Sequence, residues 1–172
     1  MNRLHRLFQG HFTPQSLRMY VAVEALFFWG TIFLCWQQFP AENKFSILTH
    51  TFSYLGSFNP DRNPAAWWLF TVAMVGWGLL SLPLLRYIAR HLRSASPKPP
   101  EKAIALLYMG VVGIILVGLC PDAREPFFGT AIRWTDLHYI GAAVLVLGTT
   151  IGIPWTAVLV YHTAKNPQGD EK

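Results

Sequence analysis

Residues 137–164 read LHYIGAAVLVLGTTIGIPWTAVLVYHTA, a run of 28 residues without Asp, Glu, Lys or Arg. Three further stretches have the same character: residues 63–85 and 103–121 carry no charge, and residues 19–41 carry only Glu24. A helix of about 20 apolar residues crosses the hydrocarbon core of a bilayer, which is about 30 Å thick. The sequence therefore predicts an all-α protein, a four-helix transmembrane bundle.

The composition of the whole chain agrees with this interpretation. Of its 172 residues, 52% are hydrophobic and 13% are charged, whereas a soluble domain has about 25% charged residues. These values exclude an ordinary soluble enzyme, a disordered chain and a disulfide scaffold. The net charge of +5 does not indicate a nucleic-acid partner, because the basic residues are concentrated between and beside the apolar stretches.

The predicted spans cover about residues 17–39, 65–87, 103–120 and 136–161 of a single integral membrane domain, 1–172, with a linker at 88–102. Ten of the fourteen Lys and Arg residues lie before or at the start of the first span, in this linker or at the end of the second span, or after the fourth span. Since Lys and Arg resist translocation, we expect these segments and both termini to be cytoplasmic. The expected location is the inner (plasma) membrane of a bacterium, with the basic segments near anionic lipid headgroups.

The connection between the first two spans contains an apolar segment that is too short to cross a membrane. Its apolar side chains recur three or four positions apart, at Phe45, Leu48, Phe52 and Leu55. This spacing predicts a short interfacial or re-entrant helix between spans one and two. Asn63 followed by Pro64 predicts the N-cap and the first helical position of span two.

Glycines recur on one face of the fourth predicted span, at Gly141, Gly148 and Gly152, while Gly110 and Gly113 lie one turn apart on the third. Glycine lets helix backbones approach closely inside a membrane. We therefore expect these faces to pack against a neighbouring span or against another subunit of a homo-oligomer or hetero-oligomer. Membrane lipid is the other expected partner.

Glu24 lies about six residues, or about 9 Å, inside the first predicted span. A carboxylate at that depth is costly unless it is protonated or paired, which makes it a functional candidate. The structural alternative is a buried polar residue that hydrogen-bonds Thr149, Thr150 or Thr156, or that reaches toward Arg18. A transport function would depend on Glu24.

Polar residues gather at the predicted outer ends of the spans. His50 and Ser53 lie in the first outer connection, Asp122 follows the third span, and His138 opens the fourth. His50, Asp122 and His138 are candidate ligands for zinc, which takes three or four nitrogen and oxygen ligands and activates a bound water. Ser53 is the candidate catalytic residue, either as a nucleophile with a histidine base or as a group that stabilises an oxyanion.

The same residues have structural alternatives. Asp136 is well placed as the N-cap of the fourth span, Asp122 suits a turn, and His138 suits a hydrogen bond at the membrane interface. Cys35 and Cys120 both lie near outer span ends. A disulfide there is geometrically allowed, but two packed free thiols are expected.

Two segments resemble a known pattern. The first is His50-Thr-Phe-Ser53-Tyr-Leu-Gly56, followed by Asn59-Pro60 and a span with Gly76 and Gly78; the second is Gly118-Leu-Cys120-Pro121-Asp122, followed by Leu137-His138-Tyr139-Ile140-Gly141-Ala142. Over residues 17–160 the chain resembles the bacterial membrane family catalogued as domain of unknown function 998. The resemblance implies a multi-span helical bundle without an agreed activity, and its matching positions are His50, Ser53, Gly56, Asp122 and His138. A weaker similarity is to seven-span zinc-dependent lipid amidases, which use a Ser, an Asp and three His, but this chain lacks three of the spans and one histidine.

Two classes of function follow from these observations. The leading hypothesis is a small inner-membrane protein without catalytic activity, whose outer-side polar pocket binds lipid or contacts a partner subunit as a scaffold. The alternative is a metal-dependent hydrolase or amidase that acts on lipids, with zinc as its cofactor.

Overall fold

The computed structural model describes residues 3–95 and 99–165. Its helices are α1 Arg3–Phe8, α2 Pro14–Gln37, α3 Trp67–Ala95, α4 Glu101–Leu119 and α5 Trp134–Lys165, with short 3-10 helices η1 Ala41–Asn43, η2 Phe52–Gly56 and η3 Phe127–Gly129. The segments Pro14–Gln37, Trp67–Ser94, Glu101–Leu119 and Trp134–His162 are long and apolar enough to cross a membrane. The predicted all-α class with four transmembrane helices is therefore confirmed.

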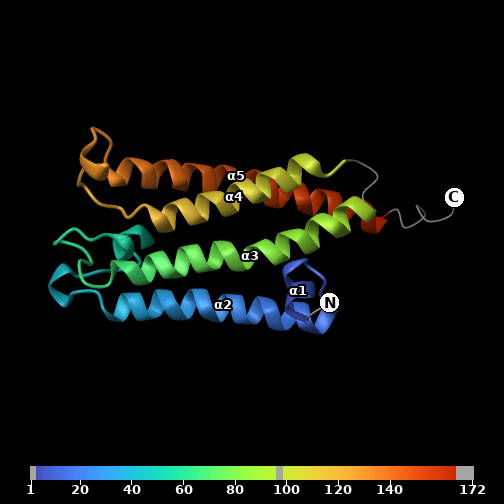
Figure 1. Ribbon diagram of the computed structural model, residues 1–172, viewed down its shortest axis with the longest axis horizontal. Helices are drawn as coiled ribbons and strands as arrows, with labels where there is room; N and C mark the ends of the chain where they lie inside the picture. Colours follow the sequence, from blue (N-terminus) through green and yellow to red (C-terminus); the bar gives the residue numbers. More distant parts are fainter. Residues whose placement is uncertain (1–2, 96–98, 166–172) are drawn as a thin grey trace.

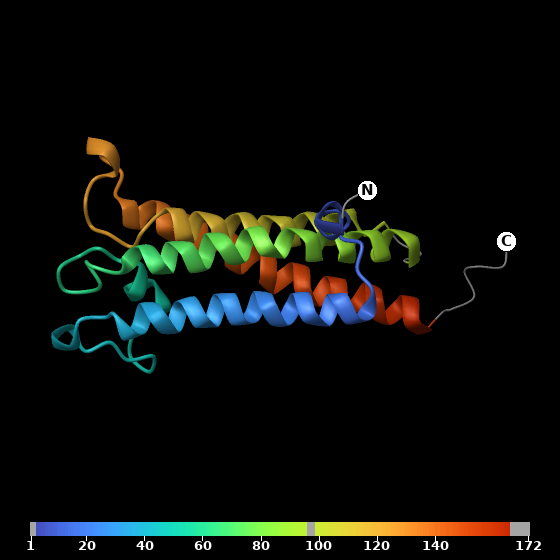
Figure 2. The same cartoon turned by 60° about the horizontal axis from the view of Figure 1, so that its bottom comes forward.

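The four long helices lie side by side in chain order (Figure 1). α2 packs on α3, α3 on α4, and α4 on α5. The view in Figure 2 shows the same neighbours from a second side. The helix α2 buries only Glu24, Ile32 and Cys35, and apolar side chains such as Leu26 and Ile153 on α2 and α5 are exposed. In a bilayer these faces meet lipid tails, which are as apolar as the side chains themselves.

The closest helix contact joins α4 and α5 through glycines. A Cβ atom added at Gly113 would lie 2.3 Å from the Leu145 backbone nitrogen, and one added at Gly148 would lie 2.3 Å from the Gly110 nitrogen. Both distances are shorter than carbon and nitrogen atoms tolerate, so only glycine permits this approach. The predicted glycine faces therefore pack two spans of the same chain, while association between chains through them stays a prediction.

The structure places two helix starts differently from the sequence prediction. α2 begins at Pro14 rather than near Leu17, because Thr13 and Ser16 form a capping box: the Ser16 backbone N–H donates to Thr13 Oγ1, and the Thr13 N–H donates to Ser16 Oγ. α3 begins at Trp67 rather than after Asn63. The Asn63 side chain does not cap this helix; it points into the bundle, where it donates to the Leu55 carbonyl oxygen at 2.8 Å.

The predicted linker 88–102 is largely helical, because α3 continues to Ala95 and α4 begins at Glu101. Ala89 and Leu92 are each 3% exposed and pack with Ala103, Ile104 and Leu159. Burial of these apolar side chains extends α3 past the arginines that mark the end of the uncharged stretch. The long arginine side chains carry their charge away from this core.

The segment 45–58 forms the short 3-10 helix η2 and turns instead of one continuous helix. Leu55 is fully buried, whereas Leu48 is 91% exposed. The regular apolar spacing therefore does not correspond to one buried helical face, and the helix predicted between the first two spans is reduced to 3-10 turns.

Candidate functional site

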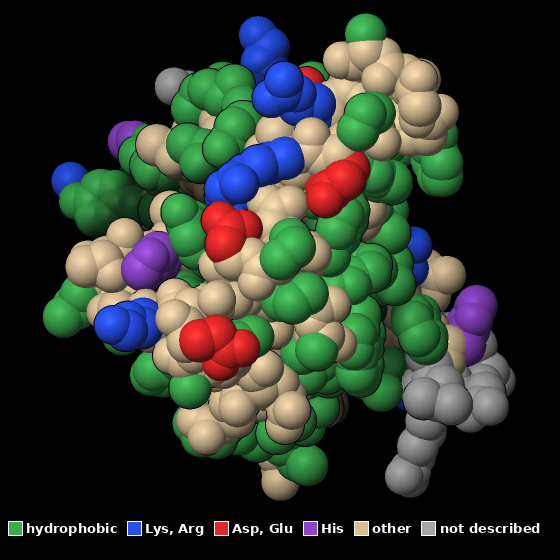
Figure 3. Space-filling view, turned by 90° about the vertical axis from the view of Figure 1, so that its left-hand side faces the viewer, with side chains coloured by type: hydrophobic (Ala, Val, Ile, Leu, Met, Phe, Trp, Pro, Cys, Tyr) green, Lys and Arg blue, Asp and Glu red, His purple; other side chains and the backbone are tan. Residues whose placement is uncertain are grey.

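The connections 38–66 and 120–133 meet at one end of the bundle, which we call the loop end. Acidic and basic side chains are interspersed on its surface (Figure 3). Beneath that surface the structure buries several polar side chains, namely those of Ser57, Asn59, Arg62, Asn63, Asp122 and His138. Because a buried polar group is costly without a partner, the hydrogen bonds of these side chains show which parts of the loop end are held together.

Arg62 and Asp122 form a buried ion pair that joins the two connections. Arg62 Nη1 lies 2.5 Å from Asp122 Oδ2 and 3.1 Å from the Asp122 carbonyl oxygen. Thr135 donates to the other carboxylate oxygen, Oδ1, at 2.7 Å, and the Ser57 hydroxyl donates to the Asp122 carbonyl oxygen at 2.5 Å. Each oxygen of Asp122 therefore has a protein donor, as a desolvated carboxylate requires.

A second layer of contacts surrounds this pair. The Arg124 backbone N–H donates to Asn59 Oδ1 at 3.3 Å, and the Arg124 side chain pairs with Asp61 at 3.0 Å on the surface. Asn43 Nδ2 donates to the Pro60 and Arg62 carbonyl oxygens at 3.0 and 2.6 Å. These bonds fix the turn that carries Arg62.

The network also reaches the end of α2. Asn63 Nδ2 contacts Cys35 Sγ at 3.3 Å, and the Cys35 thiol lies 3.5 Å from the Ala66 carbonyl oxygen. Cys35 and Cys120 are free and buried, as expected for two packed thiols. Side chains from α2, from both connections and from the start of α5 are thus joined in one polar network, which we call the loop-end network.

His138 belongs to the edge of this network. It is 3% exposed, and its Nδ1 lies 2.7 Å from the Cys120 carbonyl oxygen. Since a carbonyl oxygen only accepts, Nδ1 carries a proton and donates it to the Cys120 carbonyl oxygen. The expected interfacial hydrogen bond of His138 is therefore present.

The contacts of His50 lie within the first connection. The Ser46 backbone N–H donates to His50 Nδ1 at 3.3 Å, and the Thr49 hydroxyl lies 2.9 Å from the same atom. The His50 ring packs on the Tyr54 ring, with centroids 4.6 Å apart. The Arg62 guanidinium, which pairs with Asp122, lies 4.1 Å from the centroid of the Tyr54 ring. Pair contacts thus run from His50 to Tyr54, from Tyr54 to Arg62 and from Arg62 to Asp122.

Ser53 is half-buried in η2, where its hydroxyl lies 2.6 Å from the Thr51 hydroxyl. Within residues 3–95 and 99–165, Ser53 makes no hydrogen bond to His50 or His138. Nor does the described part of the chain contain three or more His, Cys, Asp or Glu residues grouped to hold a metal ion. Asp122 and His138 Nδ1 are already engaged with protein partners, so zinc binding by His50, Asp122 and His138 stays a prediction.

Asp136 has a different capping role from the predicted one. α5 begins at Trp134, which makes Arg133 the N-cap, and Asp136 Oδ2 accepts the Arg133 backbone N–H at 2.8 Å. Asp136 is therefore the third helical residue of a half capping box. The error is one of register, because the helix starts two residues earlier than the uncharged stretch suggests.

Glu24 is 6% exposed, as expected for a buried polar residue, but its partner differs from those predicted. The Ser81 hydroxyl of α3 donates to Glu24 Oε1 at 2.6 Å, whereas Thr149 bonds the Leu145 carbonyl oxygen within α5. α2 packs on α3, which places Ser81 within reach of Glu24. Both residues border a cavity of about 390 Å³ lined mainly by apolar and aromatic side chains, among them Phe28 and Trp77.

Sequence reasoning missed the central residue of the loop-end network. In the sequence, Arg62 is one of several acidic and basic residues in the first connection, and no motif marks Thr135. Two of the buried residues, Asn59 and Asn63, each precede a proline, and Arg62 lies in the turn sequence between these two Asn-Pro pairs. A charged residue inside such an Asn-Pro turn is the one local feature that points to a buried pair.

These features define an integral membrane protein with four candidate spans and a polar network at one end. No family model, curated protein or solved structure matches the chain. The family resemblance drawn from the two motifs therefore stays an expectation, while the class that it implies, a multi-span helical bundle, is the class observed.

Proposed function

We propose that this protein acts by binding in the membrane rather than by catalysis, with the loop end as its binding surface. The observation that carries the proposal is that the loop-end network holds two loop tips that expose large apolar side chains. Leu48 and Phe128 are 91% and 80% exposed, and Ile47 and Ile132 are 56% and 49% exposed. Apolar side chains held at the end of a transmembrane bundle suit the boundary between lipid headgroups and acyl chains.

The second tip is built to present its aromatic side chain. Phe128 has a positive φ of 47° and Gly129 a φ of 75°, and a bulky residue in this region costs about 1–2 kcal/mol. The turn is held by the Phe127 N–H, which donates to the Ile132 carbonyl oxygen at 2.7 Å, and by the rings of Phe127 and Trp134, whose centroids are 4.7 Å apart. A strained backbone that the surrounding contacts hold in place is typical of surfaces that bind a ligand or partner.

The proposed ligand of the loop end is membrane lipid, and contact with a partner subunit is the competing outcome. We propose the same setting as the sequence suggests: the inner membrane of a bacterium, with the loop end on the outer side and the basic segments in the cytoplasm. The arrangement of Lys and Arg supports this orientation, because the basic segments 3–18, 86–95 and 99–102 lie at the end opposite the loop end (Figure 1).

Lipid contact is tested by attaching an environment-sensitive fluorophore at Phe128→Cys in protein reconstituted into phosphatidylcholine vesicles. The matched control is Glu125→Cys, an exposed position on the same loop. We expect nitroxide-labelled lipids to quench the fluorophore at position 128 but not at 125. Equal quenching of both positions by aqueous iodide, with no lipid quenching at 128, would overturn lipid binding and leave a partner subunit as the occupant.

A metal-dependent lipid hydrolase is the functional alternative. It requires His50, Asp122 and His138 to hold one metal ion, in place of the observed contacts of His50 with Tyr54 and of Asp122 with Arg62. Metal analysis of the purified protein separates the two functions. Stoichiometric zinc that is lost in His138→Ala would contradict the binding proposal and support the hydrolase.

A further inference from the structure

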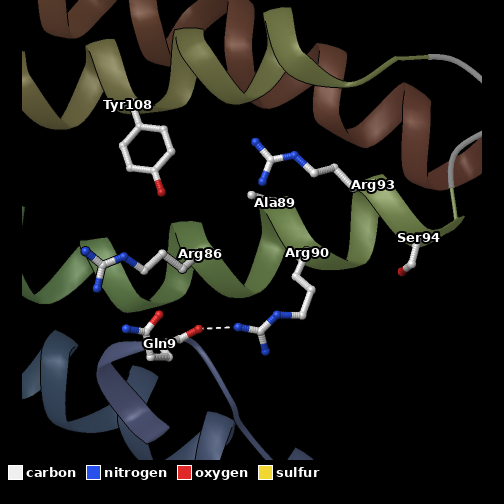
Figure 4. A pocket seen from close by; sticks show the side chains of 7 residues that line it. All are labelled: Gln9, Arg86, Ala89, Arg90, Arg93, Ser94 and Tyr108. Atoms are coloured by element: carbon white, nitrogen blue, oxygen red, sulfur yellow. Dashed lines mark hydrogen bonds between the residues drawn. The ribbon is translucent and has the colours of Figure 1, made fainter. Parts of the chain in front are cut away.

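The end of the bundle opposite the loop end contains a cavity of about 550 Å³. Three arginines of α3 line it, Arg86, Arg90 and Arg93, together with Tyr108 of α4 and Gln9 after α1 (Figure 4). The arginines are spaced by four and three residues, which places them along one side of the helix. A smaller cavity of about 250 Å³ shares Arg90 and adds Arg6 and two histidines.

The charge of these arginines is only weakly compensated. Arg86 donates to the Phe8 carbonyl oxygen at 2.5 Å, and Arg90 donates to the carbonyl oxygens of Gln9 and Gly10. Carbonyl oxygens accept hydrogen bonds but carry no net charge. Arg90 therefore anchors the segment after α1 while its positive charge remains available.

Arg93 has the one carboxylate partner among the arginines of this cavity, as far as the described residues extend. Its Nε lies 3.5 Å from Glu101 Oε1, and both side chains are more than half exposed. An exposed pair at this distance contributes little, about 0–1 kcal/mol. Arg93 can therefore leave Glu101 for a stronger anionic ligand.

Tyr108 supplies a hydrogen-bond donor to the same cavity. Its hydroxyl points toward α3 (Figure 4) and makes no hydrogen bond with another described residue. The positive field extends to His11: loss of hydration, followed by the charges of Arg90 and Arg6, lowers the pKa of His11 below its ordinary value. The cavity thus combines free donors with positive potential.

We propose that this cavity binds a phosphate-bearing anion, which the guanidinium groups of Arg86, Arg90 and Arg93 and the hydroxyl of Tyr108 hold. Guanidinium groups match phosphate oxygens in geometry and charge. The cavity lies beside the C-terminal part of α3 and the start of α4, and its volume exceeds that of a single phosphate group. The source of the phosphate is the headgroup of an anionic lipid or a soluble phosphate compound.

The test uses the full-length protein in a detergent without phosphate. Retention of phosphatidylglycerol and of zwitterionic phosphatidylcholine is measured by native mass spectrometry, and binding of inorganic pyrophosphate by calorimetry. We expect Arg93→Gln to weaken anion binding about tenfold, the size of one hydrogen bond to a charged group. The control is Arg18→Gln, which removes the same charge from an exposed position on α2 outside the cavity.

Two further variants guard against an effect of misfolding. Tyr108→Phe keeps the ring and removes only the donor, so it should weaken binding about threefold, within the range of one neutral hydrogen bond. Glu101→Gln removes the competitor of Arg93 and should strengthen binding. A gain of affinity is not expected from a damaged fold.

Retention of phosphatidylglycerol alone would support the proposal and identify a lipid headgroup. Binding of pyrophosphate that is also sensitive to Arg93→Gln would support it and identify a soluble ligand. Equal retention of both lipids, no detectable anion, or equal losses in Arg93→Gln and Arg18→Gln would overturn it.

Discussion

Asp122 receives a donor on each of its carboxylate oxygens, and this makes the Arg62–Asp122 pair the residue contact on which the loop end depends. The side chains are 11% and 5% exposed, and the charged groups lie 2.5 Å apart. Removing one partner leaves the other charge buried without compensation, which costs about 3–5 kcal/mol. We therefore expect Arg62→Gln and Asp122→Asn to lower the unfolding temperature clearly in detergent, measured by the change in tryptophan fluorescence.

The chain provides a matched control for this prediction. Arg124 and Asp61 join the same two connections at 3.0 Å, but their side chains are 65% and 57% exposed. Exposed pairs contribute about 0–1 kcal/mol, so Arg124→Gln should change the unfolding temperature little. The role assigned to the buried pair is wrong if Arg62→Gln and Arg124→Gln have equal effects.

One of the contacts that dock α1 joins a histidine, His11, to Arg90. Arg90 Nη1 donates to His11 Nδ1 at 2.8 Å, which requires Nδ1 to be unprotonated. Loss of hydration and the charges of Arg90 and Arg6 lower the pKa of His11. His91 is a second histidine that lines the smaller cavity, of about 250 Å³, beside His11. Since the docked state disfavours the protonated ring, it takes up fewer protons than the undocked state, and docking is more stable at higher pH.

The expected result is a loss of α1 docking as the pH falls through the ordinary histidine value of about 6.5. Hydrogen exchange of the backbone of residues 8–13 should accelerate between pH 7.5 and pH 5, beyond the intrinsic change in exchange rate. His11→Asn removes the titrating group and should flatten this dependence. If the acceleration persists in His11→Asn, another group at that end controls the docking.

The contact between α4 and α5 depends on the absence of side chains. Gly148→Ala would place a Cβ 2.3 Å from the Gly110 nitrogen, so the two helices must separate, at a cost of about 1–3 kcal/mol. Gly30 on α2 has no atom within 4 Å of its added Cβ, and Gly30→Ala should be neutral or stabilising by up to about 1 kcal/mol. The free energy of unfolding of each variant is measured by adding denaturant to the protein in detergent micelles. Equal stability of the two variants would contradict the close approach of α4 and α5.

At the scale of the whole molecule, the positions of the spans could be predicted because the free-energy cost of placing a charged residue in the membrane depends on that residue alone. A charge in hydrocarbon costs several kcal/mol, so the uncharged stretches locate the spans to within a few residues. Packing shifts the ends: Leu92 is buried against α4 and α5, and α3 continues beyond the first arginine as a result.

The candidate site was predictable only in part, for a related reason. The sequence indicates that Asp122 and His138 lie at the same end of the bundle, but the partner of each depends on which helices are neighbours. Arg62 and Asp122 are 60 positions apart, and Glu24 and Ser81 are 57 apart. The sequence does not identify the partner in either pair, because both pairings follow from the order α2, α3, α4 and α5 in space.

The orientation in the membrane is the prediction that links both ends of the molecule. If the arrangement of Lys and Arg decides it, the loop end is outside and the basic cavity inside. Glu125→Cys, at an exposed position of the loop end, should then react with a membrane-impermeant maleimide in intact cells, and Ser94→Cys only after permeabilisation. The native thiols give little background, because both are buried and burial also raises the pKa of Cys120. Labelling of Ser94→Cys in intact cells would reverse the orientation and place the phosphate-binding cavity on the outer surface, where cytoplasmic phosphate compounds cannot reach it.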